Sequence, residues 1–407
     1  MSTTYGSAME ISHRVPAASA VWWAVVARFL LHGLIVSTWV SRIPAIQTAL
    51  GLTNGTLGLC LLGTAVGSVA AVPLTGWLVA RFGSKRVTTW SSAGFCLALA
   101  APGLAVNALT LFWALTIYGA MAGANDVSIN SQAVVVENAL GTPTMSRFHA
   151  MFSIGGMLGA GLGGIVAAHE IAPRLHLLVA AALFLALSAS TAQRLLNAPP
   201  ETKKRTPQRA FGRIPGVLIA LTVIGFCMFL SEGAMADWVG VYLKQVLRVG
   251  AGMAAAGYAA FSAGMALFRL LGDAITKRLG PVATLRAGAL VAACGLTAAI
   301  ATQSPAWALA GFALAGAGCS VIVPLVFGAG GRVRSLPSAV GIAMVSGSGY
   351  IGFLFGPPLI GFVAQVSSLQ MGLLVVVGLC MLAAMLAPAV GLVDEREQDT
   401  QSYADNT

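Results

Sequence analysis

Residues 119–137 read Gly119-Ala-Met-Ala-Gly-Ala-Asn-Asp-Val-Ser-Ile-Asn-Ser-Gln-Ala-Val-Val-Val-Glu137 and set acidic and amide side chains inside a long apolar run. Asp126 and Asn130 are four positions apart, so a helix places them on one face. Glu137 follows Asp126 by eleven positions and returns to nearly the same direction, at about 100° per residue. A charged group at the centre of a bilayer costs at least about 2.5 kcal/mol, so this stripe should face a bundle interior or an aqueous cavity. It is either a polar contact between helices or part of a solute or proton pathway.

The composition of the whole chain indicates a polytopic membrane protein. Of its 407 residues, 57% are hydrophobic and 9% are charged, and the mean hydropathy is +0.84. A soluble domain carries about 25% charged residues. The 48 glycines suit helices that pack closely in a membrane. We therefore expect an all-α integral membrane protein.

Apolar runs of membrane-spanning length divide the chain into twelve predicted helices. They cover residues 20–42, 55–80, 86–105, 108–137, 147–168, 173–195, 214–243, 251–275, 282–301, 305–330, 337–365 and 370–392. The polar interval 197–213 separates the first six runs from the last six. We predict an N-terminal six-helix domain, a cytoplasmic linker, a C-terminal six-helix domain and two cytoplasmic tails. The N-terminal domain covers 21–196, the linker 197–213 and the C-terminal domain 214–392, and the tails cover 1–20 and 393–407.

The distribution of basic residues predicts the orientation. With both termini in the cytoplasm, most of the 23 Lys and Arg residues fall on the cytoplasmic side of the twelve helices. This accounts for the net charge of +10 without a nucleic-acid partner. We expect a multi-pass protein of the cell inner membrane that contacts the lipid bilayer and is monomeric.

The two halves of the sequence repeat. At an offset of 197 residues, Gly67 falls on Gly264 and Gly119 falls on Gly316. The same offset relates Gly155 to Gly352, Gly159 to Gly356 and Gly164 to Gly361. A repeat of six helices in the same direction predicts two parallel structural units.

One segment between the second and third predicted helices resembles a known family signature. Residues 76–86, Gly76-Trp-Leu-Val-Ala-Arg81-Phe-Gly83-Ser-Lys85-Arg86, are similar to the loop 2–3 motif of the major facilitator superfamily. Ala80 stands where that family has an acidic residue, whereas the second copy, residues 269–280, keeps Asp273. The resemblance implies the major facilitator fold, in which two six-helix halves rock to move a small-molecule solute.

Further stretches resemble the fucose-permease-like branch of that superfamily. They are Trp39 to Ile46, Asp126 to Glu137, His149 to Gly156, Glu232 to Trp238 and Gly349 to Pro358. The resemblance does not identify the solute. We expect a small solute, sugar-like or another polar metabolite, moved with protons by symport. Drug or metabolite efflux by proton antiport is the alternative.

The candidate residues of the solute and proton pathway are polar groups within apolar helices. They are Arg28, His32, Asp126, Asn130, Glu137, His149, Glu232, Asp237 and Tyr350. Asp126 is the expected coupling group, with Glu232 as the competing candidate. His149 starts its helix at a depth where Asn130 or Glu137 could reach it, which predicts a protonation switch. Five residues separate Glu232 from Asp237, so we expect at most one of them to line the same cavity as Asp126.

Several of these groups also have a structural interpretation. Arg28 and His32 are one helical turn apart and form either a functional pair or a hydrogen-bonded packing contact. Arg42 near the outer end of the first helix could extend to the interface. Tyr350 could stack on a sugar face or pack as an interfacial belt residue.

Five residues are candidates for gating. Arg81 lies in the loop 2–3 motif, and the resemblance implies that such charges pair when the cytoplasmic side closes. Arg269 and Asp273 are one turn apart and form the expected gate pair. Trp39 and Trp238 occupy matching places in the two halves, either as gate residues or as part of an interfacial aromatic belt.

Other classes of membrane protein fit the sequence less well. No lysine follows a glycine, so the phosphate-binding loop of a nucleotide-driven pump is absent from the sequence. No two of the 5 histidines show the spacing of a metal-binding helix, and the 6 cysteines are scattered through apolar runs. We therefore expect a transporter and no enzyme, with no cofactor and no metal.

Overall fold

The computed structural model describes residues 18–141, 144–197, 214–333 and 336–392, and every regular element in these ranges is helical. The first half contains α1 (Ala18–Val40), α2 (Ile43–Ala49), α3 (Asn54–Phe82), α4 (Ser84–Ala98), the short 3₁₀ helix η1 (Ala101–Leu104), α5 (Ala108–Leu140), α6 (Met145–Ala168) and α7 (Pro173–Ala192). The second half contains α8 (Gly216–Gln245), α9 (Ala251–Leu279), α10 (Pro281–Ala301), α11 (Pro305–Cys319), α12 (Ile322–Gly331), α13 (Ser338–Val366) and α14 (Leu369–Leu386).

The domain boundaries remain predictions. Most of the expected linker 197–213 and of the N-terminal tail 1–20, and all of the C-terminal tail 393–407, lie outside the described residues.

The described residues contain twelve stretches that are long and apolar enough to cross a membrane, which confirms the predicted number of spans. Three spans combine two elements: Ser19–Ala49 joins α1 to α2, Ser84–Leu104 joins α4 to η1, and Pro305–Gly331 joins α11 to α12. The first span reaches beyond its expected end at residue 42. The chain turns at Ser41 and Arg42 and resumes a helix with Pro44 in its first turn, where a missing N–H has no cost.

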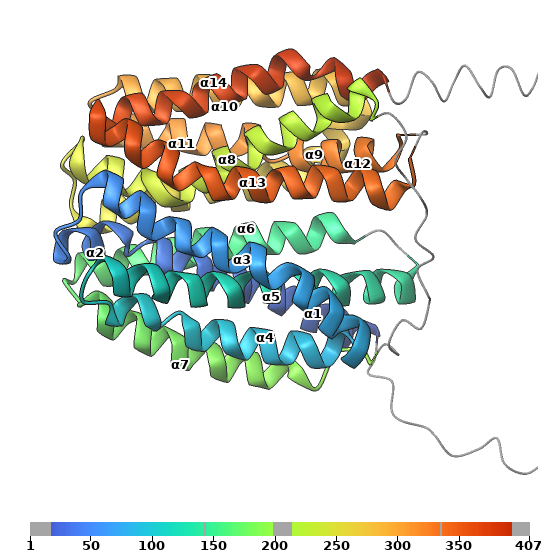
Figure 1. The fold of residues 1–407 in the computed structure, drawn as a ribbon, viewed down its shortest axis with the longest axis horizontal. Coiled ribbons are helices and arrows are strands. Elements are labelled where there is room, and N and C mark those ends of the chain that lie inside the picture. Colours follow the sequence, from blue (N-terminus) through green and yellow to red (C-terminus); the bar gives the residue numbers. More distant parts are fainter. Residues whose placement is uncertain (1–17, 142–143, 198–213, 334–335, 393–407) are drawn as a thin grey trace, which may run out of the picture.

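The two halves lie side by side as two layers of helices (Figure 1). The main contacts between them are α3 against α13 and α6 against α9. We call the end of the bundle that holds α2 the α2 end. The other, where α7 ends and α8 begins, is the linker end (Figure 1).

Helix packing explains the glycine repeat. Gly67 on α3 faces the backbone carbonyl of Thr116 on α5, and Gly264 on α9 faces that of Ala313 on α11. A β-carbon at either glycine would collide with that carbonyl. Gly67 and Gly264 therefore mark the same close helix contact in each half, because only a residue without a side chain lets the backbones approach this far.

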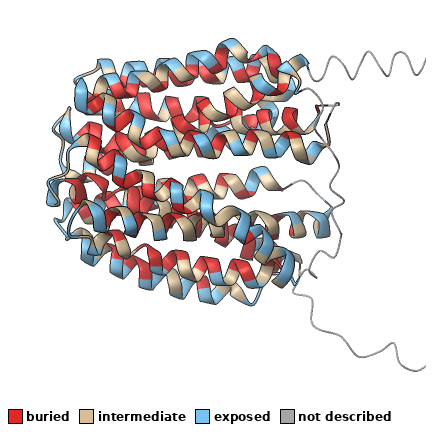
Figure 2. Cartoon of the chain, viewed as in Figure 1, coloured by how far each residue is buried: buried red, intermediate tan, exposed pale blue. Residues whose placement is uncertain are grey.

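The distribution of burial fits a bundle that is surrounded by lipid. Figure 2 shows exposed positions along the outer faces of the helices and buried positions where the layers meet near the α2 end. Trp113 is 58% exposed and Trp307 is 72% exposed, so large apolar side chains cover the outer surface. Such a surface is stable in hydrocarbon and would be unfavourable in water.

Candidate functional site

An arginine joins the two halves in the interior of the bundle. Arg269 on α9 lies 3.6 Å from Glu232 on α8, measured between Nη2 and Oε1. Its Nη1 donates a hydrogen bond of 2.9 Å to Ser153 Oγ on α6, in the other half. The Ser153 hydroxyl donates in turn to the carbonyl of His149 at 3.3 Å. A charged group of the second half is thus held by a polar group of the first.

Two atoms of this cluster lack hydrogen-bond partners within the described chain. They are Arg269 Nε and Glu232 Oε1, and both are buried. Buried polar atoms in proteins are nearly always hydrogen-bonded, and the exceptions often mark binding sites. A molecule with an acceptor for Arg269 Nε and a donor for Glu232 Oε1 would satisfy both atoms. The arrangement is therefore suited to a polar ligand.

Asp126 lies on α5, in the first half. Asn130 Nδ2 donates to Asp126 Oδ1 at 3.1 Å and to its carbonyl at 2.9 Å, so the two residues share a helix face as their spacing predicts. Asp126 keeps partial exposure although it lies within the span of α5. Its carboxyl is also within electrostatic range of the Tyr350 hydroxyl on α13, in the second half. Charged and polar groups from both halves therefore lie near each other here as well.

Asp237 and Glu232 both lie near Tyr258 on α9. Each carboxyl is within electrostatic range of the Tyr258 hydroxyl, and Asp237 also lies within range of Tyr118 on α5. Tyr258 is buried, whereas Glu232 and Asp237 are partly exposed. Three carboxyl groups, including that of Asp126, thus lie within membrane spans and close to tyrosines.

Arg28 and His32 take part in packing contacts inside the first half. The Arg28 guanidinium donates to the hydroxyl of Ser188 on α7 and, at 2.7 Å, to its carbonyl. His32 Nδ1 accepts a hydrogen bond of 2.8 Å from Asn125 Nδ2. Both side chains are buried, and neither bonds to the other half among the described residues.

A network behind His32 escaped the sequence analysis. Asn125 Oδ1 accepts a 2.6 Å hydrogen bond from Ser92, and Ser91 lies 2.8 Å from Ser128, hydroxyl to hydroxyl. Ser128 donates to the Asn125 carbonyl at 3.0 Å. The signal in the sequence was weak, because single serines are common in membrane helices.

The expected contact between His149 and a carboxylate or amide partner is wrong. Glu137 instead accepts the backbone N–H groups of Thr144 at 2.6 Å and Met145 at 2.9 Å, at the start of α6. Asn130 bonds to Asp126, as described above. The His149 ring lies edge-on to Phe29 with centroids 5.3 Å apart, and in the described residues it bonds neither to Glu137 nor to Asn130. Glu137 lies only seven positions before Thr144 in the sequence, so its carboxylate reaches the free N–H groups at the start of α6.

The expected gate pair is also wrong. Arg269 points toward Glu232 and Ser153, whereas Asp273 is exposed and forms no ion pair with Arg269 in the described chain. A spacing of four positions permits such a pair, but the partners in the interior are closer. Arg81 is exposed at the linker end and lies over the rings of Trp77 and Phe82, at 5.8 and 5.7 Å.

Three residues near the α2 end are buried. Their burial contradicts one of the roles that the sequence suggested for each of them. Trp39 is 3% exposed and Trp238 is 0% exposed, so neither belongs to an aromatic belt that faces lipid headgroups. Arg42 does not extend to the interface, since it is 2% exposed and donates to the carbonyl of Ile171. All three side chains are enclosed by helices.

Four amide side chains that the sequence analysis missed join the halves at the α2 end. They are Gln47, Asn54, Gln245 and Gln365. Gln47 Nε2 donates to Asn54 Oδ1 at 2.9 Å, and Gln245 Nε2 donates to Gln47 Oε1 at 3.1 Å. Gln365 Oε1 accepts the backbone N–H of Gly55 at 3.4 Å. We call these four residues the amide cluster.

Known proteins resemble this chain over most of its length. The sequence matches the Major Facilitator Superfamily over residues 21–334. An uncharacterised MFS-type transporter of Yersinia pestis is 36% identical over 362 residues, which cover 89% of this chain and 94% of that protein. An uncharacterised transporter of Sinorhizobium fredii is 32% identical over 371 residues, covering 91% of this chain and 98% of that protein. Among solved structures, a mutant of the nucleoside transporter NupG has the same fold, with a TM-score of 0.75 at 13% identity over 91% of this chain and 99% of that one.

Proposed function

This chain belongs to the Major Facilitator Superfamily of secondary transporters, and we propose that it moves a small polar solute, sugar-like or another polar metabolite, together with protons. The observation that carries the proposal is Arg269, which pairs with Glu232 in its own half and with Ser153 in the other. A solute bound there contacts both halves. Rocking of one half against the other then exposes the solute to each side of the membrane in turn.

A sugar-like solute suits the polar atoms of the Arg269–Glu232 cluster. A sugar offers hydroxyl groups that both donate and accept hydrogen bonds. Such a group can donate to Glu232 Oε1 and accept from Arg269 Nε, the two buried atoms without a partner in the described residues. Tyr350, on α13 in the same half as Arg269 and Glu232, is partly exposed and supplies an aromatic face for stacking.

Asp126 is the proposed proton-coupling group. It lies within a span, it is partly exposed, and Asn130 can hydrogen-bond to it whether it is charged or neutral. A group that changes its charge during the cycle couples protons to the solute, because the solute then binds one protonation state more tightly. Glu232 is the competing candidate, since the same reasoning applies to a carboxylate that Arg269 holds only at 3.6 Å.

The positive charge of the loops supports an orientation in the cell inner membrane. The linker end then faces the cytoplasm, and the α2 end faces the outer side. The proposed transporter works as a monomer. Trp39 and Trp238 then form part of the outer gate. Arg81 and Asp273, both exposed at the linker end, are the proposed cytoplasmic gate charges and would approach other groups when that end closes.

A solute panel tests the transport function. Cells with the intact gene and cells with a deletion should differ in uptake or growth on one class among sugars, sugar acids and toxic cations. Lower accumulation of a sugar in the deletion strain supports uptake. Higher sensitivity of the deletion strain to a toxic cation, with no sugar phenotype, would replace the proposal by proton antiport.

Asp126→Asn tests the coupling. With the solute from the panel, this variant should lose uphill accumulation in proteoliposomes but keep downhill exchange. Glu137→Gln is the matched control, because it removes a carboxylate from the same helix at a position that contacts backbone N–H groups. If Asp126→Asn still concentrates the solute after an imposed pH step and Glu232→Gln does not, the coupling role belongs to Glu232.

A further inference from the structure

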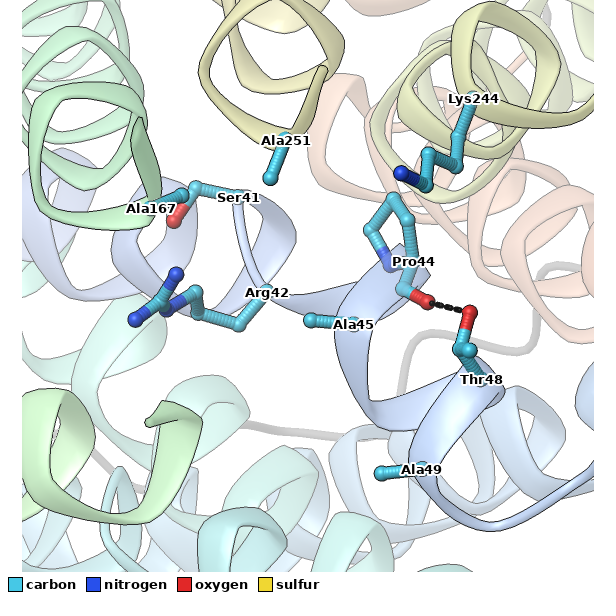
Figure 3. A pocket seen from close by; sticks show the side chains of 9 residues that line it. All are labelled: Ser41, Arg42, Pro44, Ala45, Thr48, Ala49, Ala167, Lys244 and Ala251. Carbon is cyan, nitrogen blue, oxygen red and sulfur yellow. Dashed lines mark hydrogen bonds between the residues drawn. The ribbon is translucent and has the colours of Figure 1, made fainter. Parts of the chain in front are cut away.

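A cavity of about 320 Å³ lies at the α2 end, between the two halves (Figure 3). The first half contributes the turn between α1 and α2, with Ser41, Arg42 and Thr48, and also Ala167 on α6. The second half contributes Lys244 on α8 and Ala251 on α9. The cavity is distinct from the proposed solute site, which involves Arg269 and Glu232 deeper in the bundle.

Two cations border this cavity, and none of the described residues that line it is acidic. Figure 3 shows Arg42 and Lys244 on opposite sides of the cavity. Arg42 is 2% exposed; one of its N–H groups donates to the carbonyl of Ile171, while its buried Nε has no partner in the described chain. A buried guanidinium without a counter-charge is unfavourable, since desolvation is compensated only by an opposite charge or hydrogen bonds.

A helix end adds positive potential. Ala251 is the first residue of α9, a helix of 29 residues, and it lines the cavity. Gly250 at the N-cap position has no side chain that could accept from the first N–H groups. The free N–H groups and the partial positive charge at a helix N-terminus favour an anion.

We propose that this cavity binds a small oxyanion, a carboxylate or a phosphate group. The Arg42 guanidinium, the Lys244 ammonium and the first turn of α9 supply the donors. The volume lies at the lower end of the range for ligand pockets, about 300–1,000 Å³. Because the lining comes from both halves, the anion links them and stabilises the conformation in which the α2 end is closed.

The test uses the purified full chain in detergent and requires no transported solute. Its thermal unfolding midpoint is measured against sodium phosphate, with sodium chloride at matched ionic strength as the reference. Wild type should show a saturable rise in the midpoint. Lys244→Gln should weaken the apparent phosphate affinity about tenfold, the effect of losing one charge-assisted hydrogen bond.

Two further variants make the result specific. Arg42→Lys keeps the buried charge but lacks the planar guanidinium with its several N–H donors, so it should also weaken the saturable rise. Arg248→Gln removes a cation that is exposed just beyond α8 and does not line the cavity, so it should behave as wild type. Phosphate also stabilises proteins by exclusion from their surface. A rise that is linear in phosphate and equal in wild type and Lys244→Gln would overturn the proposal.

Two additional experiments distinguish a free carboxylate from a lipid headgroup as the source of the oxyanion. Sodium acetate replaces phosphate in the first and reports on a free carboxylate. In the second, wild type and Lys244→Gln are compared in nanodiscs of phosphatidylcholine and of phosphatidylglycerol without added phosphate. Stabilisation by phosphatidylglycerol that Lys244→Gln abolishes assigns the site to a lipid headgroup. Absence of any Lys244-dependent effect in all arms refutes the site.

Discussion

Asn54 and Gln245 form a reciprocal amide pair across the boundary between the two halves. Asn54 Nδ2 donates to Gln245 Oε1 at 3.2 Å, and Gln245 Nε2 donates to Asn54 Oδ1 at 3.2 Å. Gln47 bonds to both residues. These contacts carry no net charge, so salt screens them far less than an ion pair. The amide cluster therefore links the two halves at the α2 end, and the proposed opening of this end would have to break these hydrogen bonds.

A disulfide at the α2 end should lock the transporter. A β-carbon on Gly55 of α3 would lie 3.5 Å from the Gln365 β-carbon on α13. Disulfide-bonded cysteines have β-carbons about 3.5–4.5 Å apart. The double variant Gly55→Cys with Gln365→Cys should therefore crosslink on oxidation and lose transport, and a reductant should restore it. Each single cysteine variant should transport equally with and without oxidant. Full transport by the crosslinked double variant would show that the α2 end does not open.

A methyl group at Gly58 should force the halves apart. A β-carbon there would lie 2.6 Å from the backbone carbonyl of Pro357, across the boundary. Gly58→Ala should lower the thermal unfolding midpoint in detergent and favour opening of the α2 end. Gly76→Ala is the control on the same helix, because nothing lies within 4 Å of the added carbon. That variant should keep or raise the midpoint, since alanine is favoured over glycine in a helix by about 1 kcal/mol. Equal midpoints for the two variants would contradict the close contact.

The Arg269–Glu232 pair should behave as a coupled unit. Arg269→Gln leaves the Glu232 carboxylate without its cation, and Glu232→Gln leaves the cation without its carboxylate. The side chains are only 10% and 19% exposed, so solvent compensates little. A double-mutant cycle on unfolding free energy should give a coupling of about 0.5–3 kcal/mol. Asp273→Asn, combined with Arg269→Gln, should give additive effects because the two side chains are not paired. Coupling to Asp273 instead of Glu232 would refute the assignment.

Glu137 should contribute to stability rather than to proton coupling. Its Oε2 atom accepts two backbone N–H groups at the start of α6. Glu137→Ala removes both bonds and should destabilise the protein by about 1 kcal/mol, the typical effect of losing a helix cap. Glu137→Gln keeps an acceptor oxygen and should be milder. Thermal unfolding of both variants checks the order. Loss of uphill transport by Glu137→Gln at an unchanged thermal unfolding midpoint would instead place Glu137 in the proton pathway.

The orientation of the chain can be tested by labelling. A cysteine placed in 197–213 should react with a membrane-impermeant maleimide only from the cytoplasm, and one near Ala251 only from outside, because basic loops stay inside. The background should carry Cys294→Ser, since Cys294 is exposed, whereas the other five cysteines are buried. Labelling of both sites from the same side would break the twelve-span arrangement.

Helical periodicity explains why parts of the site were predictable. Asp126 and Asn130 share a face because their spacing fixes this in any α-helix. The partners of Arg269 were not predictable in this way. Glu232 and Ser153 lie on other helices, and their approach depends on how α8, α9 and α6 are rotated against one another. The amides at the α2 end were missed for the same reason, since Gln245 is distant in sequence from Asn54.

The sequence by itself determined the class, the twelve spans and the repeat. Hydropathy and helical spacing act over neighbouring residues, and the close contacts at Gly67 and Gly264 leave a sequence mark because only glycine fits there. Only the tertiary structure decided that Arg42 and Trp238 are buried and that Arg269 bridges the halves. The physical reason is that a long side chain on a membrane helix reaches several neighbours, and its partner is chosen by the packing of whole helices.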